Sequence, residues 1–232
     1  MKYKNITILT GAGISAESGI PTYRTGEDKL WGTDFKEFST IQSLRTNRIK
    51  SIEAFNERKR RYIENDYKPN AGHFSLAKLE NYWRDNKIGC FNVITQNIDS
   101  LHELAGSNHV VHMHGSLAKK RRIDTNNVVD WGNEPLNPDL ERPEVVLFGE
   151  EIMHGRTIES ILNFTDLYIA VGTSMTVFPA SDFVLQVKQL GGYTIFVNEE
   201  KCFLDGRFHK TIYGKSSEIL PKLVDDIINE LL

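Results

Sequence analysis

The sequence predicts an α/β fold: a Rossmann-like parallel sheet with helices on both faces, plus a small lobe formed by two insertions. Two observations favour this class. Along the 232 residues, short apolar runs alternate with longer segments of helical period, which is typical of βα units around a parallel sheet. A glycine-rich turn also follows the first apolar run, at the place where a Rossmann-like fold begins its first helix.

Strands are expected where short apolar runs are bounded by Gly, Asn or Thr. Such runs suit strands that are buried on both faces of a sheet. The predicted strands cover residues 6–9, 90–94, 110–112, 145–147, 167–171 and 194–197.

Helices are expected over residues 70–86, 180–190 and 218–232. The last is the clearest, because apolar residues such as Leu220 and Leu223 recur at spacings of one, three and four and so share one helix face. Its opposite face is acidic, which favours packing on the sheet over binding to a membrane surface.

Two segments interrupt the alternation of strands and helices. Residues 34–68 are charged and mostly helical in pattern, whereas residues 119–144 open with Lys-Lys-Arg-Arg and contain three prolines. Charge runs of this kind are more typical of solvated surfaces than of nucleic-acid contacts. The predicted division is a Rossmann-like domain of residues 1–33, 70–118 and 144–232, and a small lobe of residues 34–69 and 119–143.

Composition excludes several classes of protein. With 40% hydrophobic and 25% charged residues, the chain is neither disordered nor fibrous. The net charge of −3 does not favour nucleic acid, and no apolar stretch approaches the roughly 20 residues of a membrane span. Two cysteines, Cys90 and Cys202, are too few for a disulfide framework or a four-thiolate metal site, so a reducing cytoplasm is expected.

The first predicted strand runs into Gly11, Ala12 and Gly13, with the spacing G-x-G-x-x-A. Glycines at this spacing let the backbone approach a pyrophosphate at a helix N-terminus. The alternative is a tight strand-to-helix turn without a ligand. It stays open because the acidic residue expected about 20 positions further on has no convincing counterpart, since Glu27 lies in a polar loop.

Polar side chains follow the second predicted strand: Gln96, Asn97 and Asp99. Because open α/β sheets bind ligands beyond the carboxyl ends of their strands, these groups suit ligand hydroxyls and a carboxamide. Asp99 can also serve as a helix N-cap, and the two roles are compatible.

A His-x-His-Gly sequence closes the third predicted strand. His114, followed by Gly115, is suited to act as a general base near neutral pH, although a single histidine taken by itself is more often structural. The spacing of His112 and His114 also allows metal binding, but no third ligand of the right type lies nearby.

Two later strand ends repeat the pattern. Gly172, Thr173 and Ser174 offer backbone N–H groups and hydroxyls to a phosphate, while Asn198 and Glu199 suit ribose hydroxyls. Five strand ends therefore converge on ligand-binding groups.

Taken together and in this order, the motifs resemble the sirtuin family, specifically its bacterial-type members that remove acyl groups from lysine. The resemblance runs from the first predicted strand to the last helix. It is carried by residues 11–24 (GAGISAESGIPTYR), 95–102 (TQNIDSLH), 112–115 (HMHG), 145–150 (VVLFGE), 172–180 (GTSMTVFPA) and Asn198.

The resemblance implies a reaction that consumes NAD. The acyl-lysine carbonyl oxygen attacks the anomeric carbon of the nicotinamide ribose, and nicotinamide leaves. A base matching His114 then acts on a ribose hydroxyl, which attacks the resulting imidate; Asn97 and Asp99 complete the implied catalytic set. The products are free lysine, nicotinamide and an O-acyl-ADP-ribose.

The resemblance also implies binding residues, among them a loop over NAD that contains Tyr23 and Arg24. The implied NAD contacts are Gly11, Ala12, Gly13, Ser15, Tyr23, Arg24, Gln96, Asn97, Ile98, Asp99, Gly172, Thr173, Ser174, Asn198, Glu199, Glu200 and Ser216. Residues 145–149 would pair with the substrate backbone by β-augmentation. The implied substrate contacts are Phe55, Arg58, Val146, Phe148, Gly149 and Glu150.

One structural module departs from the family. Sirtuins usually bind zinc through two cysteine pairs between the His-Gly motif and the V-V-x-F-G-E strand, but residues 119–144 contain neither Cys nor His. Carboxylates such as Asp124 and Asp130 are hard ligands, poorly suited to structural zinc. We expect no zinc, so another source of stability is needed in the small lobe.

The acyl preference depends on a small-lobe helix. Family members that favour malonyl or succinyl groups carry Tyr-x-x-Arg there, where this chain has Phe55 and Arg58. Arg58 can pair with an acyl carboxylate or lie solvated, while Phe55 offers no hydrogen bond. Losing one neutral donor costs about 0.5–1.5 kcal/mol, so removal of acetyl groups is expected together with broad or weak activity on succinyl or malonyl groups.

Two other functions would use the same pocket. In an NAD glycohydrolase or protein ADP-ribosyltransferase, water or a protein nucleophile replaces acyl-lysine. A non-catalytic NAD or ADP-ribose sensor would not need His114 beside the ribose. The leading hypothesis gives acylated protein lysines as partners, with no nucleic acid and no membrane.

Overall fold

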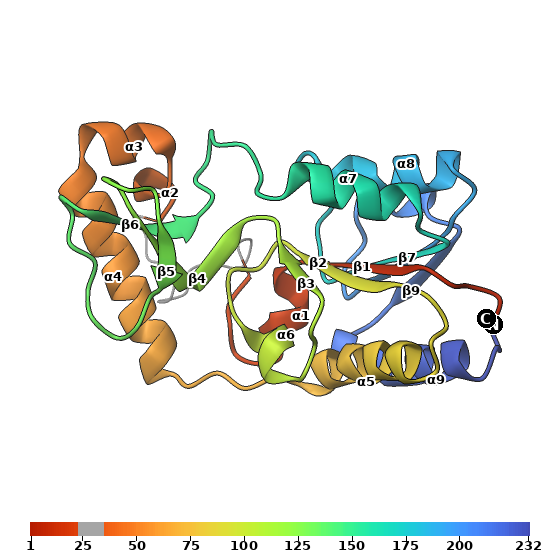
Figure 1. Ribbon diagram of the computed structural model, residues 1–232. Coiled ribbons are helices and arrows are strands. Elements are labelled where there is room, and N and C mark those ends of the chain that lie inside the picture. Colours follow the sequence, from red (N-terminus) through yellow and green to blue (C-terminus); the bar gives the residue numbers. More distant parts are fainter. Residues whose placement is uncertain (23–34) are drawn as a thin grey trace.

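The computed structural model describes residues 1–22 and 35–232, which form two sheets (Figure 1). The strands of the larger sheet are β1 Ile6–Thr10, β2 Phe91–Thr95, β3 Val110–His112, β7 Leu167–Val171, β8 Tyr193–Asn198 and β9 Lys210–Tyr213. They are all parallel, in the order β3-β2-β1-β7-β8-β9. This order runs outward on both sides from the β1–β7 pair, as in a Rossmann-like fold, and confirms the predicted class.

The helices that cover the two faces of this sheet are α5 Ala71–Asp85, α9 Ser216–Ile228, α7 Gly155–Asn163 and α8 Phe183–Gln189 (Figure 1). Successive strand residues point to opposite faces. Ile6 and Ile8 of β1 therefore pack in one apolar cluster, with side chains of α5 and α9, whereas Leu9 packs with those of α7 and α8.

The start of α5 is fixed by a capping box. The Asn70 side chain accepts a hydrogen bond from the Gly72 N–H at 2.9 Å, and His73 Nδ1 accepts one from the Asn70 N–H at 3.3 Å. The Asn70 amide also donates to the Ile14 carbonyl at 2.8 Å and to Ser18 Oγ at 2.9 Å. The cap thereby joins α5 to the turn after β1.

A separate small lobe holds α2 Phe35–Phe38, α3 Ile41–Thr46, α4 Arg48–Glu64, β4 Gly115–Arg122, β5 Val128–Asp130 and β6 Glu141–Val145. Its strands form an antiparallel sheet in the order β5-β4-β6, seen beside α4 at the left of Figure 1. Phe55 of α4, Leu117 of β4 and Trp131 are buried together, each no more than 3% exposed. This apolar contact gives the lobe a core of its own.

The basic run of β4 is paired within the small sheet. Lys120 Nζ lies 2.6 Å from a Glu141 carboxylate oxygen, and Arg121 Nε donates to Glu144 at 2.6 Å. Lys119 pairs with Asp130 of β5 and Arg122 with Asp124, so the whole run is matched by carboxylates of the small sheet and its turn.

Several predicted boundaries were wrong. The strand predicted at 145–147 ends at Val145, and β4, β5 and β9 were not predicted. Each missed strand has exposed or charged positions in place of an apolar run, so its sequence lacks the buried-strand pattern. The remaining short elements are α1 Ala12–Ala16, α6 Leu101–Leu104 and 3₁₀ turns at Ala180–Asp182 and Asp205–Arg207. None of the described helices is long and apolar enough to span a bilayer.

Candidate active site

A cavity of about 1030 Å³ opens beyond the carboxyl ends of the parallel strands. Its walls include residues that follow β1, β2, β7 and β8, and residues of the small lobe such as Phe55 and Leu147. The strand order reverses direction between β1 and β7, and open α/β sheets bind ligands at such a switch point.

The turn after β1 packs directly on the turn after β7. The Gly13 N–H donates to the Gly172 carbonyl at 2.8 Å, and the Gly11 N–H to the Val171 carbonyl at 3.0 Å. Gly172 has φ of +59°, and a Cβ there would lie 2.4 Å from the Ile14 nitrogen. Glycine at 13 and 172 is therefore required by backbone contact between the two turns as well as by any ligand.

Ser15, Asn97 and Asp99 form a polar network under the cavity. Asn97 Nδ2 donates to the Gly11 carbonyl and to Ser15 Oγ, both at 3.1 Å, and Ser15 Oγ donates to Asp99 Oδ2 at 3.1 Å. Of these residues, only Asn97 lines the cavity. Gly11, Ser15 and Asp99 are placed one layer below, where they orient Asn97 and the turn.

Asp99 is held inside the protein by hydrogen bonds. Burial raises the pKa of its carboxyl group, while the bonds from the Leu101 N–H at 3.1 Å and from Ser15 oppose that rise. The predicted N-cap role is thus met in part: Asp99 accepts from the first turn of α6, although Ser100 is the N-cap residue.

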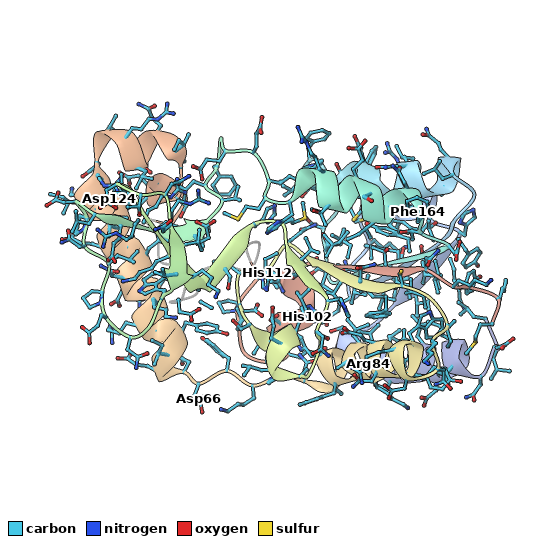
Figure 2. The ribbon with its side chains drawn as sticks, viewed as in Figure 1. Asp66, Arg84, His102, His112, Asp124 and Phe164 are labelled. Atoms are coloured by element: carbon cyan, nitrogen blue, oxygen red, sulfur yellow. The ribbon has the colours of Figure 1, made fainter. Side chains whose placement is uncertain are left out.

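His112 is doubly hydrogen bonded on the far side of this network. Its Nδ1 lies 3.1 Å from the Asn97 carbonyl and its Nε2 lies 2.6 Å from Glu103 Oε1. Burial alone would lower the pKa of His112, but the hydrogen bond and charge of Glu103 outweigh it and raise that pKa. In Figure 2, His112 and His102 lie at the end of the parallel sheet that faces the small lobe. His112 is a donor on both nitrogens and is not a free base.

His114 differs from His112 in charge and in position. Its Nδ1 lies 3.0 Å from the Gln96 carbonyl, which can only accept, so the proton is on Nδ1 and the lone pair on Nε2. His114 lines the cavity. Burial lowers the pKa of His114, and the hydrogen bond to Gln96 offsets only part of this effect. Because the pKa stays below the ordinary value of 6.5, the ring is neutral at pH 7. A neutral imidazole with a free Nε2 is the form that a general base requires.

Gln96 offers a donor to a ligand. Its Oε1 accepts from Thr173 Oγ1 at 3.3 Å, but its buried Nε2 has no hydrogen-bond partner among the described residues. A buried unpaired donor is costly unless a ligand or water satisfies it. The other predicted NAD contacts that line the cavity are Ala12, Gly13, Ile98, Gly172, Thr173, Ser174, Asn198, Glu199, Glu200 and Ser216.

The structure adds Glu17, which sequence reasoning missed. Glu17 lines the cavity and accepts hydrogen bonds from the Ser217 N–H at 3.0 Å, from Ser216 Oγ at 3.3 Å and from Ser217 Oγ. It thereby ties α1 to the N-terminus of α9. Its position inside the glycine-rich motif was the available signal, but its partners lie about 200 residues away in sequence.

All of the predicted substrate residues reach the cavity. Phe55 and Arg58 of α4 are buried in its wall, with the Arg58 guanidinium carbon 4.5 Å from the Phe55 ring centroid. Val146, Phe148, Gly149 and Glu150 also line the cavity, and Phe148 is 55% exposed. Tyr23 and Arg24 lie outside the described residues.

No cluster of three or more potential metal ligands occurs among residues 1–22 and 35–232. The segment expected to hold zinc in a sirtuin packs instead around Trp131, whose Nε1 donates to the Glu134 carbonyl at 3.0 Å. The donor set of this lobe does not fit a structural zinc ion.

Comparison with known proteins supports the resemblance. The Sir2 family model matches residues 11–179. The NAD-dependent protein deacylase SIR2rp3 of Leishmania major is 40% identical, covering 98% of this chain and 97% of its own length. A crystal structure of a Sir2 homologue with NAD has a TM-score of 0.85 at 32% identity, covering 100% of this chain and 92% of that one. A Sir2 homologue variant with 2′-O-acetyl ADP-ribose gives a TM-score of 0.85 at 32% identity, with 99% and 94% covered. The chain belongs to the Sir2 family.

Proposed function

We propose that the protein is an NAD-dependent protein-lysine deacylase that releases nicotinamide and O-acyl-ADP-ribose. The observation that carries this proposal is the state of His114, a neutral imidazole that lines the cavity and whose Nε2 has no hydrogen-bond partner among residues 1–22 and 35–232. A protein that only binds NAD needs contacts but no base. The deacylase name of a full-length relative and the acetyl ADP-ribose bound by a structural neighbour support the same conclusion.

In this proposal, His114 Nε2 takes a proton from a ribose hydroxyl, which then attacks the transferred acyl group. The Gln96 carbonyl fixes the tautomer, because it holds the Nδ1 proton. Asn97 lies at the cavity wall with its amide fixed by Gly11 and Ser15, and it orients the nicotinamide ribose. Asp99 acts on this reaction through Ser15, as a positioning residue.

NAD would extend along the strand ends. Gly13 and Gly172 line the cavity without side chains and so leave room for its phosphates, to which the hydroxyls of Thr173 and Ser174 are suited. Gln96 Nε2, which is buried without a partner, is suited to a ligand acceptor near the nicotinamide end. The adenosine half would lie against the residues that follow β8 and precede α9, which are Asn198, Glu199, Glu200 and Ser216.

The substrate peptide would bind along residues 146–149. The Phe148 N–H donates to the Ser39 carbonyl at 2.9 Å, and the Phe148 carbonyl accepts from the Ile41 N–H at 3.0 Å, so this residue is already paired. Among the described residues, no hydrogen bond reaches the Val146 carbonyl or the Gly149 N–H. Those two groups support pairing with an extended peptide.

We propose the two domains predicted from the sequence, with the cavity between them. The strand ends would supply the NAD side and the small lobe the acyl-lysine side. Neither Cys90 nor Cys202 forms a disulfide within the part of the chain that the structure describes, which suits a reducing cytoplasm.

Acyl preference is expected to respond to one hydroxyl. Phe55→Tyr adds a donor next to Arg58 and should raise the ratio of succinyl to acetyl turnover by up to about tenfold, because a neutral hydrogen bond contributes about 0.5–1.5 kcal/mol. Competition between succinyl- and acetyl-lysine peptides measures this ratio. Arg58→Leu should lower it; an unchanged ratio in both variants would exclude Arg58 as a carboxylate contact.

The pH dependence of kcat/KM should reflect the titration of His114. Because burial lowers its pKa below the ordinary histidine value of 6.5, the neutral base is present above that lowered pKa and is lost as the pH falls through it. We expect kcat/KM for an acetyl-lysine peptide to fall on the acid side with a midpoint below 6.5. A midpoint above 6.5 would instead indicate His112, whose pKa is raised.

Metal analysis tests the departure from the family. We expect less than 0.1 zinc per chain in purified protein and unchanged thermal unfolding after treatment with a chelator, because structural zinc requires N and S ligands that this lobe lacks. One zinc per chain would contradict this expectation.

One product analysis tests the activity. The protein is incubated with NAD and an acetyl- or succinyl-lysine peptide, and the products are identified by mass. Nicotinamide release that depends on the peptide and yields O-acyl-ADP-ribose supports the proposal. Peptide-independent ADP-ribose or ADP-ribosylated protein would indicate glycohydrolase or transferase activity, and no turnover would indicate a sensor.

A further inference from the structure

The turn after β6 forms one edge of the cavity and is closed by Glu150. The Glu150 N–H donates to the Leu147 carbonyl at 2.9 Å, and Glu150 Oε2 accepts from the Leu147 N–H at 2.8 Å. These two bonds fix Phe148 and Gly149 between them. Both of these residues line the cavity, and Gly149 has φ of +93°.

Arg142 of β6 binds the carboxylate that closes this turn. Its Nη1 donates to Glu150 Oε1 at 2.7 Å, and its Nη2 donates to Glu150 Oε2 at 2.8 Å and to the Val145 carbonyl at 3.0 Å. The side chains are only 19% and 23% exposed. A partly buried, bidentate pair is stronger and more geometrically specific than a surface ion pair.

The bonds of Glu150 favour a bracing role over direct contact with substrate. Burial alone would raise the pKa of Glu150, but the hydrogen bonds of Arg142 and Leu147 outweigh it and hold that pKa below its ordinary value. The group is therefore a carboxylate, and both of its oxygens already accept charged or backbone hydrogen bonds. Little of its hydrogen-bonding capacity is left for a peptide.

The turn is held from two sides. Backbone bonds to Ser39 and Ile41 hold Phe148 against the helical part of the small lobe. On the other side, the Arg142–Glu150 ion pair joins the turn to β6 of the small sheet, and the Leu147 side chain lies in the same apolar cluster as Leu117 of β4. Removing either charge would leave the other partly buried without a partner and would release the turn.

We propose that Arg142 is a positioning residue for the acyl-lysine peptide: through Glu150 it holds the Val146 carbonyl and the Gly149 N–H in the geometry that an extended peptide needs. This inference rests on the proposed function. It gives the small sheet a part in substrate binding, because Arg142 belongs to the strand β6.

The test compares Arg142→Gln and Glu150→Gln with a matched control. Both variants should raise KM for an acetyl-lysine peptide about tenfold or more, while KM for NAD changes less than twofold. Since the two residues act as a unit, the double variant should be no worse than either single variant. The control is Arg121→Gln, which removes an ion pair of the same small sheet, between Arg121 and Glu144. It should leave KM for the peptide within twofold of the wild-type value, and thermal unfolding verifies that each variant is folded.

Three results would overturn the inference: an unchanged peptide KM in folded Arg142→Gln, an equal rise in both KM values, or an equal effect of the Arg121 control. If the wild-type protein makes no O-acyl-ADP-ribose, the proposed function fails separately. Fluorescence anisotropy of a labelled acetyl-lysine peptide then decides the matter. Weaker binding to Arg142→Gln than to wild type and to Arg121→Gln supports the inference, and equal binding to all three refutes it.

Discussion

His114→Ala is expected to lower kcat for deacylation by about 10²–10⁴-fold while NAD binding is retained. The size follows from what a positioned general base ordinarily contributes. The retention follows from geometry, because the proposed NAD site has many other lining residues along four strand ends, whereas the imidazole Nε2 belongs to His114 alone among the cavity-lining residues of the described chain. Mass spectrometry of the products measures the loss of deacylation, and calorimetry measures whether NAD affinity is retained.

A histidine away from the site controls for this variant. His154 is exposed at the start of α7, and His154→Ala should retain wild-type turnover. If His114→Ala keeps more than a tenth of wild-type kcat, or loses NAD binding together with activity, His114 is not the general base.

Trp131→Ala is expected to lower the free energy of unfolding by about 3–5 kcal/mol. Trp131 is 3% exposed, packs with Phe55 and Leu117, and lies 5.4 Å from the ammonium group of Lys59, measured to its ring centroid. Removing so large a buried side chain leaves a cavity that the surrounding residues cannot fill. Urea unfolding measures the change. A family module that usually depends on zinc is thus stabilised here by an apolar core.

Two variants separate the contributions of Trp131. Trp131→Phe keeps most of the ring but loses the hydrogen bond to the Glu134 carbonyl, so it should cost only about 1 kcal/mol. Val129→Ala, at a 43% exposed position of β5, should change stability by less than about 0.5 kcal/mol. If Trp131→Ala unfolds at the same urea concentration as wild type, the lobe does not depend on this core.

The sequence was sufficient to predict the class of fold and the strand ends that are followed by polar, potentially ligand-binding residues. Buried parallel strands such as β1 and β7 are continuous apolar runs, and polar residues that follow them are conspicuous. The acidic residue that usually lies about 20 positions after a dinucleotide-binding glycine turn has no counterpart here, and the fold gives the reason. The chain inserts α2 to α5 between β1 and β2, so the neighbouring strand ends only at Thr95.

The sequence did not predict how deep each site residue lies below the cavity or which residues are hydrogen bonded to one another. The motifs place Ser15, Asn97 and Asp99 in one set, but only tertiary packing puts Asn97 at the cavity wall and the other two beneath it. The contact of Glu17 with Ser217 crosses the whole chain, and no local pattern marks it. Local spacing indicates which residue types gather; the hydrogen-bond geometry decides which of them can touch a substrate.

The backbone bridge between Thr40 and Phe148 has a consequence for protein engineering. It joins the helical insertion to the cavity-edge turn, so residues more than 100 positions apart form a single mechanical unit. Replacing α4 alone with that of a relative, in order to change acyl preference, would place new side chains against a turn whose sequence is adapted to the original helices. A chimera should exchange residues 39–64 and 142–150 together.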